Sequence, residues 1–100
     1  MKIREGLEID DDRLAEICRR YGVARLDLFG SALREDFRPD SDVDLLYVFS
    51  PDVHIGLKIH DLELELSDLF GRQVDLVSKR WLRSLYRDEV IAQSRELYAA

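Results

Sequence analysis

The strongest constraint on the fold is the segment 28–49, which reads Leu-Phe-Gly-Ser-Ala-Leu-Arg-Glu-Asp-Phe-Arg-Pro-Asp-Ser-Asp-Val-Asp-Leu-Leu-Tyr-Val-Phe. It predicts a strand that ends at a Gly-Ser turn, a polar loop containing Pro39, and a second strand that begins with two aspartates. The second strand, residues 43–49, is almost entirely apolar, which is typical of a central strand. The segment therefore predicts a sheet with this strand inside it.

Hydrophobic periodicity predicts the helices. Within residues 10–21, apolar side chains recur at helical spacing, aspartates crowd the expected N-terminus, and Gly22 follows as a stop. Residues 56–70 contain alternating leucines, but helical spacing extends over a longer span, so we expect a helix there. Cys18 lies on the apolar stripe of the first helix and is expected to be a core residue.

The remaining elements complete one expected α/β domain over residues 1–100. Residues 23–29 and 73–77 are expected to be strands, and residues 31–35 a short helix after the Gly-Ser turn. Ser78 is expected to cap a helical tail that includes Leu97. One hundred residues suffice for one modest core.

Composition narrows the function class. The net charge is −6 and the sequence pI is about 4.8, which argues against nucleic acid as the main partner. A single cysteine excludes an intrachain disulfide, and no apolar run has the length of a signal peptide or a membrane span. We therefore expect a cytoplasmic protein with no membrane association.

The paired aspartates predict a metal site. Residues i and i+2 of a strand point to the same face, so Asp42 and Asp44 present two carboxylates side by side, with Val43 turned into the core. Such a pair repels unless a cation lies between the charges, and hard oxygen ligands suit Mg²⁺. If the strand at residues 73–77 neighbours the second strand, Asp75 adds a third carboxylate. Three carboxylates suit a two-metal clamp on a phosphoryl group.

The Gly-Ser turn predicts the other half of the site. Gly30 allows the backbone to approach a phosphate closely, and the free N–H groups of a following helix favour an anion. The Ser31 hydroxyl adds a donor. Arg34 lies one helical turn further on and is expected to pair with phosphate oxygens. Together these residues predict a triphosphate site beside the carboxylates.

Three other motifs do not fit. An EF-hand loop on the Asp-x-Asp-x-Asp run would need glycine at Leu45 and glutamate at Pro51. Phosphatases of the haloacid-dehalogenase type carry Asp-x-Asp after an apolar strand, whereas here the strand follows the pair. A P-loop would need Gly-Lys-Ser/Thr after the turn, which is missing.

The order Gly30-Ser31, Arg34, and then Pro-Asp-Ser-Asp42-x-Asp44-Leu-Leu resembles the DNA polymerase beta-like nucleotidyltransferases, and within them the minimal, MntA-like proteins. The resemblance implies a nucleotidyltransferase fold, with a small mixed sheet flanked by helices. It also implies ATP as donor, Mg²⁺ as cofactor, and transfer of AMP with release of pyrophosphate. Asp42 and Asp44 would be metal ligands, and Asp75 the third carboxylate that activates the acceptor hydroxyl. Gly30, Ser31 and Arg34 would bind the triphosphate.

The resemblance further implies an antitoxin paired with a HEPN-domain toxin, with a toxin tyrosine as one acceptor, in a homo- or hetero-oligomer. A second hypothesis is a binding antitoxin that covers the toxin without transferring AMP. Glu35 favours it, since related sequences often have a small residue there and an acidic side chain repels triphosphate. Transfer to a small molecule such as an aminoglycoside would need a further substrate-binding surface.

Two stripes of charged residues, one on the second expected helix and one on the tail, are expected to be surface features. The acidic stripe on the second helix is expected to be solvated, with docking of a basic partner as the functional alternative; it comprises Asp61, Glu65 and Asp68. The basic stripe on the tail is expected to be solvated or to pair with that acidic stripe; it comprises Lys79, Arg80, Arg83 and Arg87. Trp81 and Tyr86 are expected to be core or partner contacts.

Overall fold

The computed structural model describes residues 1–82 and 84–100, and for residues 81 and 84–87 it describes the backbone alone. Within this part of the chain, a four-stranded sheet has the strand order β5-β4-β3-β6. The strands are β3 (Val23–Phe29), β4 (Val43–Phe49), β5 (Val74–Ser78) and β6 (Arg95–Ala99). β3 runs antiparallel to β4 and β6, whereas β4 and β5 are parallel. The α/β class with a small mixed sheet is thus confirmed.

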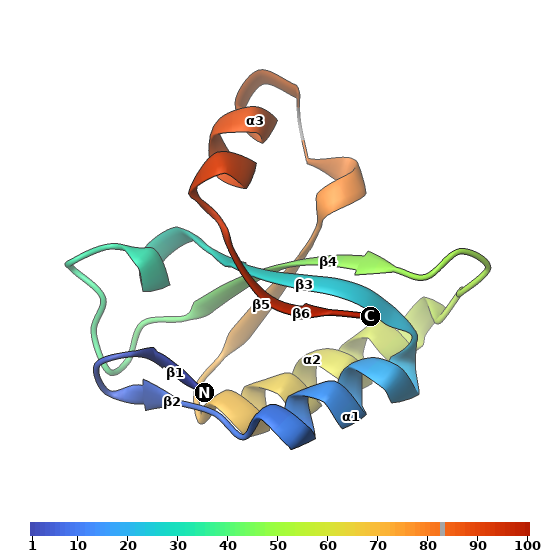
Figure 1. Ribbon diagram of the computed structural model, residues 1–100, viewed down its shortest axis with the longest axis horizontal. Helices are drawn as coiled ribbons and strands as arrows, with labels where there is room; N and C mark the ends of the chain where they lie inside the picture. Colours follow the sequence, from blue (N-terminus) through green and yellow to red (C-terminus); the bar gives the residue numbers. More distant parts are fainter. Residues whose placement is uncertain (83) are drawn as a thin grey trace.

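Helices lie on both sides of this sheet (Figure 1). α1 (Asp11–Tyr21) and α2 (Ile59–Phe70) lie side by side against one face, and α3 (Ser84–Gln93) stands on the other side. The short 3-10 helices are η1 (Gly30–Leu33), η2 (Gly56–Lys58) and η3 (Lys79–Trp81). A two-stranded hairpin of β1 (Lys2–Arg4) and β2 (Leu7–Glu8) precedes α1 and was not expected from the sequence.

α1 begins and ends where the sequence predicted. The Asp10 carboxylate accepts hydrogen bonds from the backbone N–H groups of Asp12 and Arg13, and so satisfies free donors of the first turn. Gly22 ends the helix in the left-handed conformation with φ 75°. Cys18 is fully buried, and burial raises the pKa of its thiol to about 12. The expectation that it is a core residue is confirmed.

The core fills the layer between the sheet and the α1–α2 pair. α2 contributes Leu62 and Leu66, and the sheet contributes Leu26, Leu28 and Leu45, all with no exposed surface. Burying one such leucine stabilises a fold by about 1.5–3 kcal/mol. Residues 59–70 therefore form a helix, as expected, and not a strand. The helix buries one continuous stripe of apolar side chains.

The helical tail is confirmed in part, since η3 (Lys79–Trp81) and α3 (Ser84–Gln93) are helical, but it differs from the prediction at both ends. Ser78 is the last residue of β5 and its side chain makes no capping hydrogen bond. Leu97 lies in β6, not in a helix, and only 7% of it is exposed. Residues 95–99 form a strand because they pair with the edge of β3 and because Leu97 packs into the core there. The expected strand at residues 73–77 is shifted by one residue, although Gln73 O already accepts a 2.9 Å hydrogen bond from Val43 N.

The charged stripes find partners that the sequence did not indicate. Glu65 accepts hydrogen bonds from Arg20 and from the Tyr21 hydroxyl, and Asp68 pairs with Arg13, so α1 neutralises much of the acidic stripe. Lys79, the first residue of the basic stripe, does not pair with the acidic stripe of α2. Its ammonium group lies near the Asp27 carboxylate instead. The side chains of Trp81, Arg83, Tyr86 and Arg87 lie outside the described residues. In the part of the chain that is described, helices are too short or too polar to cross a membrane.

Candidate active site

The Gly-Ser turn lies directly against the aspartates of β4. Gly30 has φ 73°, a conformation that other residues adopt only with strain, and a Cβ built on it would overlap Asp44 Oδ2. The Ser31 backbone N–H donates to the Asp44 carboxylate, and Ser31 Oγ donates to Asp42 O at 3.1 Å. The short helix expected at residues 31–35 is a 3-10 helix, η1, that starts one residue earlier at Gly30 and ends at Leu33, so Arg34 and Glu35 lie outside it. Glycine at this position thus allows the turn and the carboxylate to touch.

The parallel pairing of β4 and β5 brings the carboxylates together. Asp44 is the direct register partner of Asp75, and Asp42 lies just before β4. Burial raises the pKa of Asp44, and the charges of Asp75 and Asp42 raise it further, against the Ser31 N–H bond and the Arg34 charge, which lower it. Val43 between the two aspartates is fully buried, as expected. The structure therefore places Asp42 and Asp75 close enough to Asp44 for their charges to act on its carboxylate.

This donor set fits a divalent cation that shares its coordination with a substrate. The neighbouring charges of Asp75 and Asp42 help to raise the pKa of Asp44, and a positive charge beside the Asp44 carboxylate would offset them. Among the described residues, no three His, Cys, Asp or Glu side chains stand where they could hold one ion together. Mg²⁺ is commonly bound by only one or two carboxylates, with substrate phosphates and waters completing its shell. The site therefore fits Mg²⁺ that arrives with a phosphate ligand.

Arg34 lies at the exposed end of η1. Its Nε is 3.5 Å from Asp36 Oδ1, its backbone N–H donates to Ser31 O at 3.0 Å, and its charge lowers the pKa of Asp44. It thus belongs to the site, although its pairing with phosphate stays a prediction. Glu35 is an exposed turn residue next to it, and the expectation that Glu35 repels triphosphate also stays a prediction.

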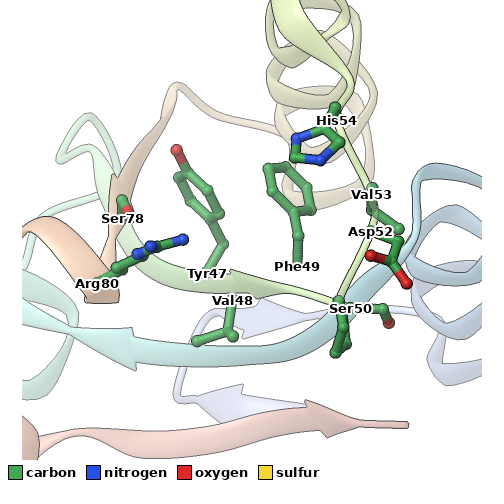
Figure 2. Close-up of a pocket in the computed structure, with 10 residues that line it drawn as sticks. Tyr47, Val48, Phe49, Ser50, Asp52, Val53, His54, Ser78 and Arg80 are labelled. Atoms are coloured by element: carbon green, nitrogen blue, oxygen red, sulfur yellow. The ribbon is translucent and has the colours of Figure 1, made fainter.

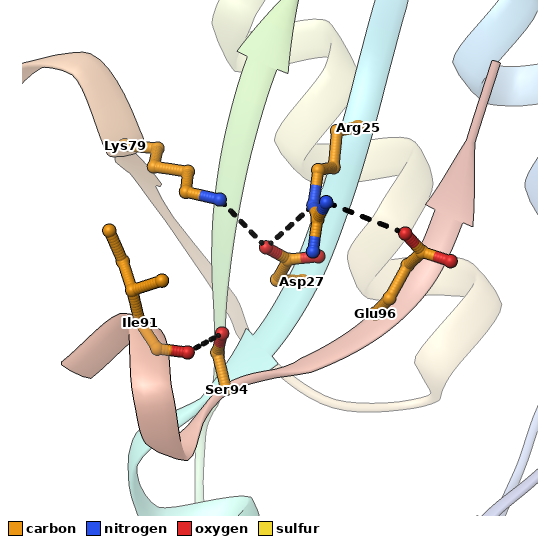
Figure 3. A network of polar contacts seen from close by, with 6 residues as sticks. All are labelled: Arg25, Asp27, Lys79, Ile91, Ser94 and Glu96. Carbon is orange, nitrogen blue, oxygen red and sulfur yellow. Dashed lines mark hydrogen bonds and ion pairs between the residues drawn. The ribbon is translucent and has the colours of Figure 1, made fainter. Parts of the chain in front are cut away.

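Sequence reasoning missed a buried carboxylate on the same face of the sheet. Asp27 has no exposed surface, receives two hydrogen bonds from Arg25 Nε at 2.9 and 3.0 Å, and has Lys79 Nζ at 3.5 Å (Figure 3). It pairs with Leu46, two residues beyond Asp44, so both aspartates face away from α1 and α2. Lys79 thereby ties the segment after β5 to this face. Arg25 and Asp27, two residues apart in a strand, were the available signal.

A cavity of about 480 Å³ lies away from these carboxylates. It opens at the far end of β4, beside Tyr47, Phe49, Ser78 and Arg80 (Figure 2). Tyr47 and Phe49 share the strand face of the core residue Leu45, opposite to that of Asp44. The carboxylates and the Gly-Ser turn therefore form an open surface site, separate from this cavity.

Comparison with known proteins agrees with the geometry. The family model described as a nucleotidyltransferase domain matches residues 12–98. The chain is 42% identical over 69 residues to the protein adenylyltransferase MntA of Thermococcus cleftensis, covering 69% of each chain. A solved chain assigned to the minimal nucleotidyltransferases aligns with TM-score 0.68 and 36% identity, over 84% of this chain and 85% of that one.

Two further solved structures share the fold at lower identity. A toxin–antitoxin complex with AMP-PNP aligns with TM-score 0.70 and 20% identity, over 92% of this chain and 75% of that one. A tri-AMPylated HEPN toxin of Shewanella oneidensis in complex with its MNT antitoxin aligns with TM-score 0.56 and 21% identity, over 90% and 70%. These two comparisons support the fold.

Proposed function

Since the chain belongs to the nucleotidyltransferase domain family, in its minimal MntA-like branch, we propose that it transfers AMP from ATP to a tyrosine hydroxyl of a HEPN-domain toxin and is that toxin's antitoxin. The observation that carries the proposal is the register of β4 and β5, which sets Asp44 opposite Asp75 beside the turn at Gly30. Relatives of the fold complexed with HEPN toxin or AMP-PNP support the choice of partner and donor.

Asp42 and Asp44, with Asp75 beside them, would hold two magnesium ions that enter with the nucleotide. Magnesium, when bound there, supplies positive charge that neutralises the phosphoryl oxygens. The raised pKa of Asp44 fits this role, because a carboxylate that is costly to ionise alone is stabilised by a cation. The three carboxylates thus make the site dependent on a divalent ion.

The turn binds the triphosphate in this proposal. A phosphate lies against the backbone at the start of η1, the Ser31 hydroxyl exchanges its bond to Asp42 O for a phosphate oxygen, and Arg34 exchanges Asp36 for phosphate. Because the turn contacts Asp44 directly, phosphate binding and metal binding are coupled. The nucleotide is held with its α-phosphorus facing the carboxylates.

The transfer is an in-line displacement at that phosphorus. The acceptor oxygen forms a bond to the α-phosphorus while the bond to the bridging oxygen breaks, and pyrophosphate leaves with the electron pair. Asp75 accepts the hydroxyl proton, since it adjoins Asp44 on the same face. The product is an AMP-modified hydroxyl of the partner, and the partner supplies the acceptor.

Radiolabelled ATP tests the proposal directly. The purified protein, Mg²⁺ and its cognate HEPN-domain protein are incubated with ATP labelled at the α-phosphate. Label is expected on the partner with the native chain and is expected to vanish with Asp42→Asn. Asp40→Asn is the matched control, because Asp40 is an exposed aspartate of the preceding turn with the same spacing. Equal labelling by both variants would overturn the assignment, and protection of cells by Asp42→Asn would support the binding antitoxin instead.

A further inference from the structure

Two arginines from distant parts of the chain meet at one aromatic ring beside the site. The guanidinium carbons of Arg4 and Arg72 both lie 4.6 Å from the centroid of the Phe37 ring. Arg4 belongs to β1, and Arg72 follows α2. Phe37 lies in the loop between the Gly-Ser turn and the aspartates of β4. A ring face attracts guanidinium groups within about 6 Å of its centroid, so both arginines are anchored to this loop.

The side chain of each arginine also donates hydrogen bonds to backbone carbonyls at one end of the loop. Arg4 Nη1 donates to Ala32 O at 2.9 Å and to Arg34 O at 2.7 Å, where η1 ends. Arg72 Nη1 donates to Arg38 O at 3.0 Å and to Ser41 O at 3.3 Å, immediately before Asp42. Arg4 therefore fixes the phosphate side of the loop, and Arg72 fixes the metal side. We call Arg4, Phe37 and Arg72 the arginine clamp.

The loop has little else to hold it. Residues 34–36 and 38–40 are exposed and have no helical or strand structure. Its internal bonds are local: Arg38 N donates to Ser41 Oγ at 2.9 Å, Ser41 N to Arg38 O at 3.0 Å, and Phe37 N to Arg34 O at 3.4 Å. Exposed turns of this kind open locally at low cost unless side chains tie them down. Among the described residues, the long-range ties on this segment are the clamp and the packing of the Phe37 ring against the core.

The side-chain chemistry suits arginine specifically. The planar guanidinium stacks on a ring and donates in its own plane at the same time, whereas a lysine ammonium provides a point charge. Among the described residues, the Nε atoms of both arginines are buried without a hydrogen-bond partner. Each arginine therefore acts on the loop through stacking and through its terminal nitrogen, and a lysine would reproduce neither contact fully.

We propose that Arg4 and Arg72 are positioning residues for nucleotidyl transfer: by clamping Phe37 and the loop backbone, they hold in place the loop whose two ends, joined by the Ser31 Oγ–Asp42 O hydrogen bond, carry the phosphate-binding turn and the metal-binding aspartates. This inference rests on the proposed function. Neither arginine touches the reacting atoms; both act through residues 32–41. A shift of about 1 Å in a reacting group can lower a rate by about 100-fold, so the clamp controls turnover more than nucleotide binding.

The first test measures the loop itself and needs no enzyme activity. Amide hydrogen exchange is compared between the native chain, Arg72→Ala and Arg13→Ala. Arg13 is the matched control, since it is an exposed arginine that bridges α1 to Asp68 away from the site. We expect the amides of Arg38 and Ser41 to exchange at least about 10-fold faster in Arg72→Ala, with α1 unchanged. Exchange at native rates in that variant would overturn the clamp, whether or not AMP transfer occurs.

The second test separates positioning from general stability. Phe37→Tyr keeps the ring face and is expected to retain turnover, whereas Phe37→Leu keeps apolar volume without a ring face. For Phe37→Leu, Arg4→Lys and Arg72→Lys, we expect kcat to fall by about 10- to 100-fold while KM for ATP changes less than about 3-fold. Native kcat in all three variants would contradict positioning. Absence of AMP transfer by the native chain would contradict the proposed function and leave the exchange result to decide the clamp.

Discussion

Gly30→Ala tests whether the Gly-Ser turn and the Asp44 carboxylate form one structural unit. The substitution adds a methyl group where Asp44 Oδ2 now lies, in a backbone with φ 73°. An L-residue in the left-handed region costs about 1–2 kcal/mol. For a chain of this size, each kcal/mol lowers the melting temperature by about 4–8 °C. The overlap adds a second effect, because the Asp44 carboxylate must move away from the turn.

The second effect falls on activity. Displacing the Asp44 carboxylate breaks its bond to the Ser31 N–H and changes its distance to Asp75, so a loss of about 100-fold in turnover is expected. Gly56→Ala is the matched control, since Gly56 has φ 55° but a Cβ there meets no atom within 4 Å. It carries the backbone cost without the overlap.

Thermal melts and single-turnover AMP transfer are measured for both glycine variants at saturating ATP and partner. Both are expected to melt lower than the native chain, and Gly56→Ala is expected to keep transfer within about 2-fold. Only Gly30→Ala should lose turnover. Equal turnover in the two variants would refute the claim that contact between the turn and Asp44 sets the geometry of the site.

Three further predictions concern stability and reactivity. The folded-state pKa of Asp44 is raised, so its contribution to stability is present below the ordinary carboxyl value of 3.8 and is lost as pH rises through the folded pKa. In metal-free buffer, Asp44→Asn should therefore melt higher than the native chain near neutral pH, with the gap closing on acidification; a constant gap across a pH series of melts would contradict this. The Cys18 thiol, with a pKa of about 12 and no exposed surface, should react with a thiol reagent only at the rate of unfolding, and rapid reaction of the native chain would count against the core placement. Leu97→Ala should cost about 2–5 kcal/mol in urea unfolding because it opens a cavity, whereas Leu64→Ala, at a position 68% exposed, should cost less than about 0.5 kcal/mol.

Local patterns predicted much of the fold. Val23–Phe29 and Val43–Phe49 were predicted with their observed ends, because turn residues and apolar runs bound them on both sides. Asp10 and Gly22 marked the ends of α1 for the same local reasons. β6 was missed because its strand state depends on the free edge of β3, which no local pattern encodes. The hairpin of β1 and β2 is too short to carry a pattern.

The site divides in a similar way. Asp42, Asp44, Gly30 and Ser31 could be chosen from one short segment, since strand geometry and turn chemistry place them together. Asp75 could be included only by assuming that its strand neighbours β4, and the parallel pairing of β4 and β5 confirms that assumption. The supporting contacts could not be foreseen. Arg72 reaches Arg38, 34 residues away, and Lys79 reaches Asp27, 52 residues away, and such pairs follow only from the folded topology.

AMP transfer by this site is measured most directly as the intact mass of the cognate HEPN-domain protein after incubation with ATP and Mg²⁺. The native chain should add whole AMP units to it and release one pyrophosphate for each unit. Asp44→Asn and Asp75→Asn should leave the mass of the partner unchanged, whereas Asp40→Asn should modify it at the native rate. An unmodified partner with the native chain, or full modification by Asp44→Asn, would contradict the assignment of these carboxylates as the centre of an AMP-transferring site.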